Sequence, residues 1–230
     1  MIPKIIHYCW FGKKELPPLA RKCIASWREF LPDYEIKEWN EDNFDVWAIP
    51  YTKDAYNARK YAFVSDYARF WILYNYGGVY FDTDVELIAP LDDILAKAPF
   101  MGLEIAGEHP AVAPGLGMAA EPGLQLYNEI LERYHTMSFT TPDGTINPYS
   151  MIPMVTELLK SKGLSGNGDI EHIANITIYP PSWFNPYDYL TGRMKKTSDT
   201  KSIHWFAMSW MQPQPKWKVL VKRWLRRLKK

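Results

Sequence analysis

Two acidic residues one position apart, Asp82 and Asp84, have the types and the spacing to hold a cation. They follow Gly-Gly-Val-Tyr-Phe at 77–81, and this composition predicts a buried strand over 79–88. Residues two apart in a strand point to the same side, so we expect both carboxylates to project together. Like charges repel unless a cation lies close, and Mn²⁺ or Mg²⁺ accepts carboxylate oxygens. The spacing predicts a divalent-cation site at the carboxyl end of this strand, where open α/β sheets bind ligands.

A charged pair of opposite sign lies just upstream. Residues 58–76 are apolar nearly all round and precede Gly77-Gly78, which predicts a largely buried helix with a glycine cap. Asp66 and Arg69, three positions apart, share one face of that helix. Because a buried ion pair is costly unless it is well partnered, two interpretations stay open. The pair is either a structural salt bridge or part of a polar site.

These side chains need a sheet to position them, and the first forty residues begin one. Residues 3–10 and 34–39 read as strands, with an amphipathic helix at 17–32 between them. This order opens an α/β sheet. Further helices are expected near 91–97, 123–135 and 149–162, and further strands near 100–105, 115–120, 174–179 and 201–210. We expect one α/β domain over 1–212, a Rossmann-like mixed sheet flanked by helices, and a separate tail over 213–230.

The composition limits the classes of function. Hydrophobic residues make up 47% of the 230 residues and charged residues 23%, which excludes a disordered chain. Aromatic residues reach 15%, which suits stacking on sugars or nucleobases and equally suits an aromatic core. Cys9 and Cys23 have no metal or disulfide spacing, so we expect a reducing compartment. No apolar stretch long enough to span a membrane occurs, and we expect a cytoplasmic protein without a nucleic-acid partner.

The last fifteen residues, 216–230, form a basic tail. They contain eight basic residues and no acidic one, while the rest of the chain is net acidic. Apolar residues recur between the basic ones at helical spacing, at Trp217, Leu220, Val221, Trp224, Leu225 and Leu228. We expect a basic amphipathic helix on an anionic membrane surface, at the inner face of the cytoplasmic membrane. The alternative is a terminal helix docked on the domain.

Three blocks in order resemble a known family. They are IPKIIHYCWFG at 2–12, SDYARFWILYNYGGVYFDTDVE at 65–86 and IHWFAMSW at 203–210. Together they resemble the DXD-motif sugar transferases of the capsular-polysaccharide and initiating-mannosyltransferase type, with the glucosyltransferase domains of large clostridial toxins as distant relatives. The resemblance implies a GT-A fold, a nucleotide-sugar donor, a Mn²⁺ or Mg²⁺ ion and transfer with retention of anomeric configuration.

The resemblance also implies roles for individual residues. Trp10 matches an aromatic residue that stacks on uracil, and Tyr80 one that supports the nucleotide. Asp66 and Arg69 match a catalytic pair that grips the donor sugar and the diphosphate region. Asp82 matches a contact to ribose and metal, and Asp84 a direct metal ligand with a catalytic role. His204 falls where relatives place a further metal ligand, and Ser209 and Trp210 where they hold the leaving phosphate.

The expected reaction moves a hexose, UDP-linked, to a glycan or lipid-linked glycan acceptor in capsule, lipopolysaccharide or other surface-polysaccharide synthesis. No unassigned carboxylate stands out as a nucleophile, so front-face attack with the leaving phosphate as base is favoured. The Gly-rich stretch 113–123 either approaches a ligand closely or forms a simple turn, and His7 is expected to be structural. Two alternatives remain, a haloacid-dehalogenase-like phosphatase that uses Asp82 as nucleophile and a non-catalytic carbohydrate-binding protein.

Overall fold

The computed structural model describes residues 1–97, 99–106 and 109–207. The strands of its main sheet lie in the order β2-β1-β3-β7-β5-β9-β8, and β6 pairs with β5 beside this path. These strands are β1 (Ile5–Cys9), β2 (Glu35–Trp39), β3 (Gly78–Tyr80), β5 (Phe100–Ala106), β6 (His109–Val112), β7 (Met118–Ala120), β8 (Glu171–Ile173) and β9 (Ile176–Tyr179).

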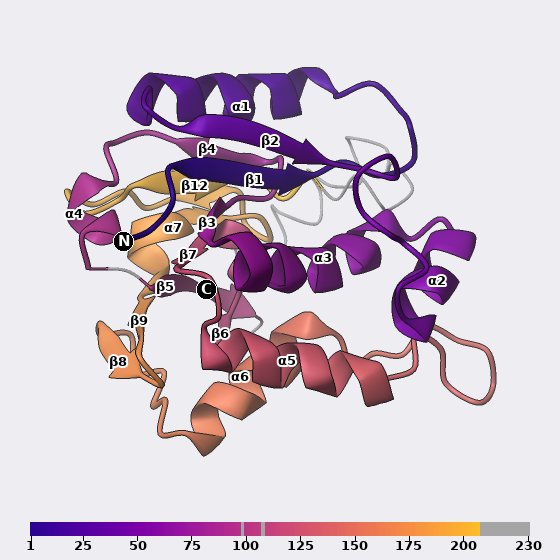
Figure 1. The fold of residues 1–230 in the computed structure, drawn as a ribbon. Helices are drawn as coiled ribbons and strands as arrows, with labels where there is room; N and C mark the ends of the chain where they lie inside the picture. Colours follow the sequence, from indigo (N-terminus) through magenta and orange to yellow (C-terminus); the bar gives the residue numbers. More distant parts are fainter. Residues whose placement is uncertain (98, 107–108, 208–230) are drawn as a thin grey trace.

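Two small sheets and a set of helices complete the described structure (Figure 1). The small sheets pair β4 (Val85–Leu87) with β12 (Ser202–His204), and β10 (Tyr187–Asp188) with β11 (Arg193–Met194). The helices are α1 (Pro18–Phe30), α2 (Pro50–Asn57), α3 (Tyr61–Tyr76), α4 (Asp92–Leu95), α5 (Gln125–Thr136), α6 (Met151–Ser161) and α7 (Pro181–Phe184), with a 3₁₀ turn, η1, at Pro114–Leu116.

The direction of the strands decides which ends meet at one edge of the sheet. Strand β1 runs parallel to β2 and β3, while β7 is antiparallel to both β3 and β5. Strand β5 is in turn parallel to β9. The carboxyl ends of β2, β1, β3, β5 and β9 therefore lie at the same edge, and this carboxyl edge is where such sheets bind ligands.

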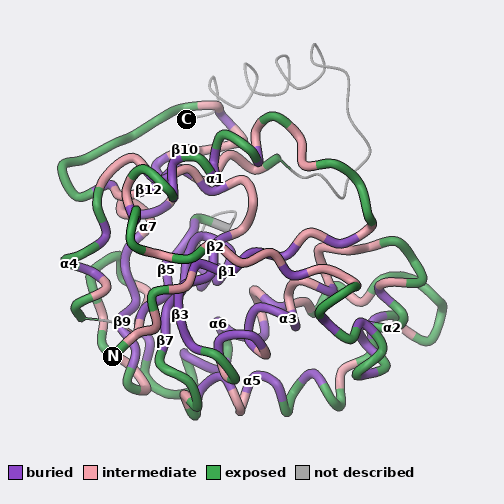
Figure 2. The backbone as a smooth tube through the Cα atoms, turned by 45° about the horizontal axis from the view of Figure 1, so that its top comes forward, coloured by how far each residue is buried: buried purple, intermediate pink, exposed green. Residues whose placement is uncertain are grey.

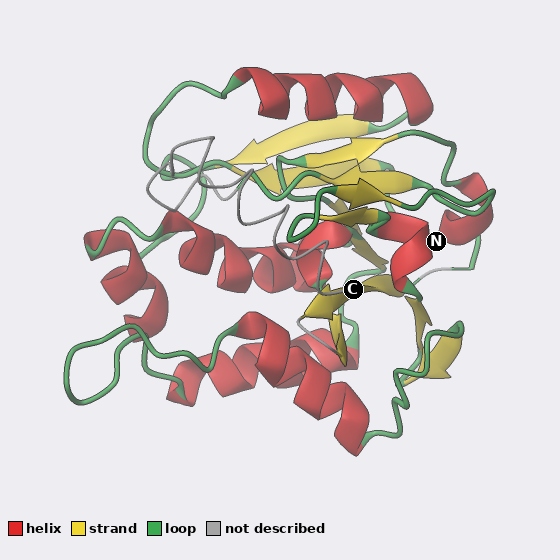
Figure 3. Ribbon diagram, turned by 180° about the vertical axis from the view of Figure 1, so that it is seen from behind, coloured by secondary structure: helices red, strands yellow, loops and turns green. Residues whose placement is uncertain are grey.

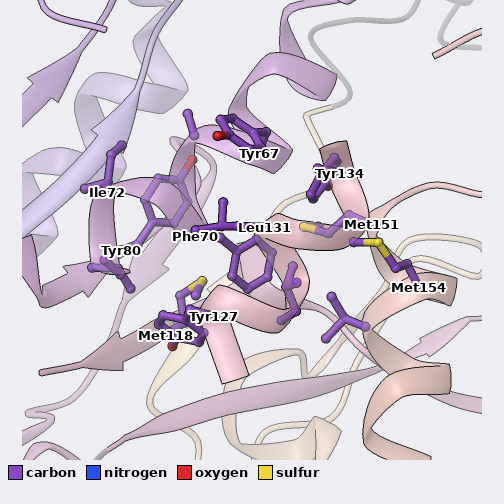
Figure 4. Close-up of a cluster of buried hydrophobic side chains, with 14 of the residues drawn as sticks. Tyr67, Phe70, Ile72, Tyr80, Met118, Tyr127, Leu131, Tyr134, Met151 and Met154 are labelled. Atoms are coloured by element: carbon purple, nitrogen blue, oxygen red, sulfur yellow. The ribbon is translucent and has the colours of Figure 1, made fainter. Parts of the chain in front are cut away.

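Two buried clusters cover the two faces of the sheet, with α1 on one side and α3, α5 and α6 on the other, as Figure 3 shows from behind. The α1 face contains Trp27, Phe81 and Phe184. The α3 face contains the aromatic and Met side chains of Figure 4, among them Phe70 and Tyr127. The strands between the layers are largely buried, whereas exposed residues lie mainly in loops and on outer helix surfaces (Figure 2).

The glycine pair after α3 sets the strand against it. Gly77 ends the helix with φ 64°, and its N–H donates to the Leu73 carbonyl. Gly78 has φ 97°, and a Cβ there would lie 2.6 Å from the Ile5 carbonyl oxygen. The imidazole of His7 bonds to the Gly77 carbonyl (3.0 Å), and its other ring nitrogen accepts from the Trp39 indole (3.0 Å). Both nitrogens of His7 are thus used within the fold, as a structural histidine requires.

Several expected elements differ from the structure. The strand expected over 79–88 is wrong, because the chain turns after Tyr80 and resumes as β4 in a different sheet. The helix expected over 58–76 begins at Tyr61, and the strand expected over 115–120 is reduced to β7 because η1 occupies its first half. Elements α2, β6, β8 and α7 were not anticipated.

The tail and the proposed boundary at 212/213 lie outside the described residues. Among the residues that are described, no helix combines the length and the apolar character needed to cross a membrane.

Candidate active site

The Asp-Thr-Asp segment forms a turn at the carboxyl edge rather than part of a strand. The Val85 N–H closes the turn onto the Asp82 carbonyl (3.0 Å), and the Asp82 N–H donates to the Gly115 carbonyl (3.1 Å). Helix α1 holds the strand that leaves the turn, because the Trp27 indole donates to the Val85 carbonyl (2.8 Å) and Ser26 Oγ accepts from the Leu87 N–H (2.9 Å). The two carboxylates are therefore placed by different neighbours and not by strand alternation.

Asp82 lies in a compact ionic cluster on the α3 face. Arg69 Nη2 is 2.9 Å from Asp66 Oδ1 and 3.2 Å from Asp82 Oδ1, and Arg69 Nη1 donates to Asp82 Oδ2 (3.3 Å). The Tyr80 hydroxyl donates to Asp82 Oδ1 (3.0 Å), and Arg69 Nε donates to the Ser65 carbonyl. The Arg69 side chain is 3% exposed and that of Asp82 is 29% exposed. Arg69 is thus more deeply buried than the two carboxylates that it contacts.

Burial dominates the electrostatics of this cluster. It raises the pKa of Asp66 to about 6, against the opposing effect of Arg69. It also raises the pKa of Asp82, with Arg69 opposing and Asp84 adding to the rise. Cys9, at the end of β1, is buried beside Arg69 and Tyr80, and burial raises the pKa of its thiol to about 12. The thiol is therefore protonated and inert as a nucleophile.

Asp84 lies beside His204 on the other side of the turn. Asp84 Oδ1 is 3.2 Å from His204 Nε2, and Asp84 Oδ2 accepts from the Ala207 N–H (2.7 Å). Burial would raise the pKa of Asp84, yet the neighbouring His204 lowers it below its usual range. Burial would lower the pKa of His204, and Asp84 with the other nearby carboxylates raises it. His204 Nδ1 is buried and has no hydrogen-bond partner among the described residues.

Glu104 is a further acid of this region that the sequence analysis did not select. It lies near the end of β5, 9% exposed, and no hydrogen bond or ion pair joins its carboxylate to another described residue. Burial raises its pKa; His204 opposes this, and Asp82 and Asp84 add to it. A lone Glu inside the apolar strand sequence Phe-Met-Gly-Leu-Glu-Ile-Ala was the available signal, because Glu is seldom buried without a partner.

Gly115 in η1 closes against the Asp82 cluster. A Cβ at this position would lie 2.0 Å from Asp82 Oδ2 and 2.9 Å from Arg69 Nη1. The stretch 113–123 was expected either to approach a ligand closely or to form a simple turn. It contains the turn η1, whose backbone at Gly115 packs closely against Asp82 and Arg69.

The structure brings together most of the predicted site residues. Asp66, Arg69, Tyr80 and Asp82 form one contact group, and Asp84 and His204 form a second one beside it. Trp10 follows β1 at the same carboxyl edge, half-buried, and its indole N–H closes a short loop by donating to the Lys14 carbonyl. Ser209 and Trp210 lie outside the described residues.

The donor atoms at this edge fit a divalent ion that is shared with a substrate. Among residues 1–97, 99–106 and 109–207, no group of three or more His, Cys, Asp or Glu is arranged to hold a metal on its own. Both Asp82 oxygens are already engaged. The 3.2 Å between Asp84 Oδ1 and His204 Nε2 is close to the roughly 3 Å between adjacent ligands of an octahedral ion. Ions of this type typically take one or two protein ligands plus substrate phosphates.

Comparisons with known proteins agree with this geometry. Residues 17–101 match the glycosyltransferase sugar-binding region containing the DXD motif. The chain is 32% identical over 112 residues to inositol phosphoceramide mannosyltransferase 1 of Schizosaccharomyces pombe, a match that covers 44% of this chain and 33% of that protein. It is 35% identical over 98 residues to inositol phosphoceramide mannosyltransferase 3 of the same yeast, with 41% and 27% covered. The chain thus spans about a third of these relatives or less.

A solved structure shares the fold across nearly the whole chain. It is a glycosyltransferase involved in the glycosylation of the major capsid of PBCV-1, with a TM-score of 0.51 and 13% sequence identity, covering 90% of this chain and 95% of that one. The expected α/β fold of GT-A type, with a mixed sheet flanked by helices, is confirmed. Residues 17–101 are thus similar to the sugar-binding region of the DXD-motif glycosyltransferases, and the Asp-Thr-Asp sequence of this region lies in the turn from Asp82 to Asp84.

Proposed function

We propose that this protein is a metal-dependent hexosyltransferase that moves a hexose from a nucleotide sugar, UDP-linked, to a glycan or lipid-linked acceptor with retention of configuration. The observation that carries the proposal is the Asp84–His204 pair, 3.2 Å apart, at the carboxyl edge beside the Asp82 cluster. A carboxylate and an imidazole are suitable ligands for Mn²⁺ or Mg²⁺ once the imidazole is neutral.

The residues of the proposed site have different roles in binding the ion and orienting the donor. Asp84 and His204 would hold the ion, and a bound divalent ion stabilises the negative charge that develops on a departing diphosphate. Asp66 and Asp82 would orient hydroxyl groups of the donor, because each presents a carboxylate fixed by Arg69. Arg69 itself is more deeply buried than either carboxylate, and we propose that it acts by positioning them. Trp10, at the end of β1, would stack on the base.

The acceptor and the place of action rest on other grounds. The curated relatives are named as mannosyltransferases of inositol phosphoceramide, which supports a hexose donor such as mannose and a membrane lipid or lipid-linked glycan as acceptor. The basic sequence 216–230 supports action at the inner face of the cytoplasmic membrane, on a surface polysaccharide in synthesis. Removing residues 216–230 should abolish binding to anionic vesicles and leave donor hydrolysis intact.

Calorimetry with nucleoside diphosphates tests the central proposal. UDP and GDP are titrated into the protein with and without Mn²⁺, and donor hydrolysis is then screened across UDP- and GDP-linked hexoses. We expect one nucleotide to bind markedly tighter with Mn²⁺, and we expect Asp84→Asn and His204→Ala to remove that gain. Asp93→Asn is the matched control, because Asp93 pairs with Lys201 on the surface, outside the proposed site.

The two alternative functions predict different experimental results. A carbohydrate-binding protein would bind free sugars without regard to nucleotide or metal. A phosphatase would acquire a phosphoryl group on Asp82, which mass spectrometry detects, but both Asp82 oxygens are held by Arg69 and Tyr80. Nucleotide binding that is unchanged by Mn²⁺ would overturn the metal-dependent transferase.

A further inference from the structure

We propose that Glu104 is a catalytic carboxylate that faces the donor hexose and stabilises the positive charge that develops at its anomeric carbon. This inference rests on the proposed transferase function and deepens it by assigning a residue to the sugar itself. Glu104 is not a nucleophile in this proposal, so the front-face attack expected from the sequence is unchanged.

Glu104 is buried and has no hydrogen-bond or ion-pair partner among the described residues. It is 9% exposed, and no arginine, lysine or hydrogen-bond donor of the described residues contacts its carboxylate. Asp82 and Asp66, by contrast, share the Arg69 guanidinium. An unpaired buried carboxylate costs several kcal/mol of lost solvation, so proteins keep one mainly where a ligand supplies the missing partner.

Strand alternation points Glu104 to the α1 face. Met101 and Leu103 of β5 belong to the cluster under α3, whereas Phe100 belongs to the cluster under α1. A Cβ on Gly102 would meet Leu116 and Phe184, which also belong to the α1 cluster. Glu104 follows this alternation and projects to the side on which β12 carries His204. The charged groups near enough to shift the pKa of Glu104 are His204, which lowers it, and Asp82 and Asp84, which raise it.

The order of strands places Glu104 beyond the diphosphate position. Along the carboxyl edge the chain presents Trp10 after β1, Asp82 after β3, Gly115 and Gly117 before β7, and Glu104 at the end of β5. If the base lies at Trp10 and the diphosphate at the turn after β3, the sugar extends toward β5. Two strand spacings, about 10 Å, separate β3 from β5.

The step balances without any further reactant. The bond between C1 and the diphosphate oxygen breaks, and its electron pair leaves with the diphosphate. The acceptor hydroxyl oxygen forms the new bond to C1, and its proton passes to the departing phosphate oxygen. Glu104 stays ionised and forms no bond; its negative charge lies where C1 becomes positive. Such preorganised charge is typically worth 100- to 1,000-fold or so in kcat.

The test compares Glu104→Gln and Glu104→Asp with wild type. The donor is the one that wild type hydrolyses fastest among UDP-glucose, UDP-galactose, UDP-N-acetylglucosamine and GDP-mannose with Mn²⁺. We expect Glu104→Gln to lower kcat at least about 100-fold, with KM and the Kd of the nucleoside diphosphate–Mn²⁺ pair changed less than about twofold. Glu104→Asp, which keeps the charge, should retain more activity than Glu104→Gln.

Glu35→Gln is the matched control, because Glu35 is exposed at the start of β2, at the opposite edge of the sheet. Urea unfolding confirms that each variant is folded. A Glu104→Gln enzyme with kcat within about threefold of wild type overturns the inference and leaves the proposed function standing. A loss of nucleoside diphosphate–Mn²⁺ affinity equal to the loss of kcat also overturns it, because Glu104 would then be a metal ligand. Absence of hydrolysis by wild type would instead overturn the proposed function, and this inference with it.

Discussion

The two carboxylates of the Asp-Thr-Asp turn lie in contrasting surroundings. On the α3 face, Asp82 and Asp66 share Arg69, and Tyr80 donates to Asp82 (3.0 Å). On the α1 face, Asp84 pairs with His204, whose Nδ1 has no partner among the described residues, and Glu104 lies near them without a direct ion pair to a described residue. We call these the Asp82 cluster (Asp66, Arg69, Tyr80, Asp82) and the Asp84 cluster (Asp84, Glu104, His204).

The difference suggests how such a site divides stability from ligand binding. In the Asp82 cluster, hydrogen bonds from Arg69 and Tyr80 hold the carboxylates of Asp66 and Asp82, so it is expected to keep its geometry whether or not a substrate is present. In the Asp84 cluster, His204 Nδ1 and the Glu104 carboxylate have no hydrogen-bond partner among the described residues, and two carboxylates placed in this way favour binding of a cation and of developing positive charge. Mutations in the Asp82 cluster should therefore mainly lower the free energy of unfolding, and mutations in the Asp84 cluster should mainly lower kcat.

Replacing Arg69 with Met should give the largest effect on folding. It would leave the partly buried Asp66 and Asp82 without the buried cation that they share, and removing one partner of a buried ion pair typically costs about 3–5 kcal/mol. Urea unfolding at neutral pH measures the free energy of unfolding. Lys4→Met is the control, because the exposed Lys4–Asp33 pair (3.4 Å) should contribute less than about 1 kcal/mol. A loss as small as that of the control would contradict the proposal that Arg69 holds the Asp82 cluster together.

His7 provides a reference for a histidine whose two nitrogens are both used, unlike His204. Burial lowers the pKa of His7 to about 4, from 6.5. The unfolded chain therefore binds a proton at a higher pH than the folded one. Above pH 6.5 His7 is neutral in both states and does not lower the free energy of unfolding. As the pH falls from 6.5 toward 4, protonation of the unfolded chain lowers the free energy of unfolding by about 3 kcal/mol. Urea unfolding at pH 7, 5 and 4 should show this slope, and His7→Gln should flatten it.

Gly115→Ala should disturb the Asp82 cluster through space alone. The added Cβ would lie 2.0 Å from Asp82 Oδ2, and overpacking of this kind costs about 1–3 kcal/mol. Because the closest clash is with the Asp82 carboxylate, the penalty of Gly115→Ala should be smaller when it is added to Asp82→Ala than when it is made in wild type. Strictly additive losses in that cycle would show that Gly115 acts through another contact.

Glu104→Gln should give the smallest change in stability, and in the opposite direction. Removing an unpaired buried charge should raise the free energy of unfolding by about 1 kcal/mol, whereas Glu35→Gln should leave it unchanged. Thermal unfolding of the two variants beside wild type measures both values. A destabilised Glu104→Gln variant would indicate that Glu104 has a structural partner, and would remove the contrast between the two clusters.

The sequence predicted the order of elements better than the geometry of the turn. The α/β alternation and the Gly77-Gly78 cap could be predicted because they depend on local periodicity and backbone freedom. Asp82 and Asp84 were expected to share one side of a strand, an error that arose because the apolar run continues into β4 without a local turn signal. What ends β3 is the pairing of β4 with β12 and its bonds to α1, all from distant residues.

The site residues show the same limit. The Asp66–Arg69 contact follows from their spacing on one helix. The contact of Asp84 with His204 joins residues 120 positions apart, and the sequence indicated it through resemblance alone. Glu104 was overlooked because the local signal, one acidic residue in an apolar strand, does not show which residues surround it. Its surroundings come from β12 and from the turn after β3, which only the folded chain brings near.

The pairing of β4 with β12 has a consequence for synthesis on the ribosome. Strand β4 is complete by residue 87, but its partner and His204 are made more than a hundred residues later. A nascent chain that has emerged as far as residue 190 already contains Asp82, Asp84 and Glu104, yet no imidazole from position 204. Such a chain should bind manganese and nucleotide poorly, so competence would arrive late in translation, when the last described strand joins the first half of the molecule.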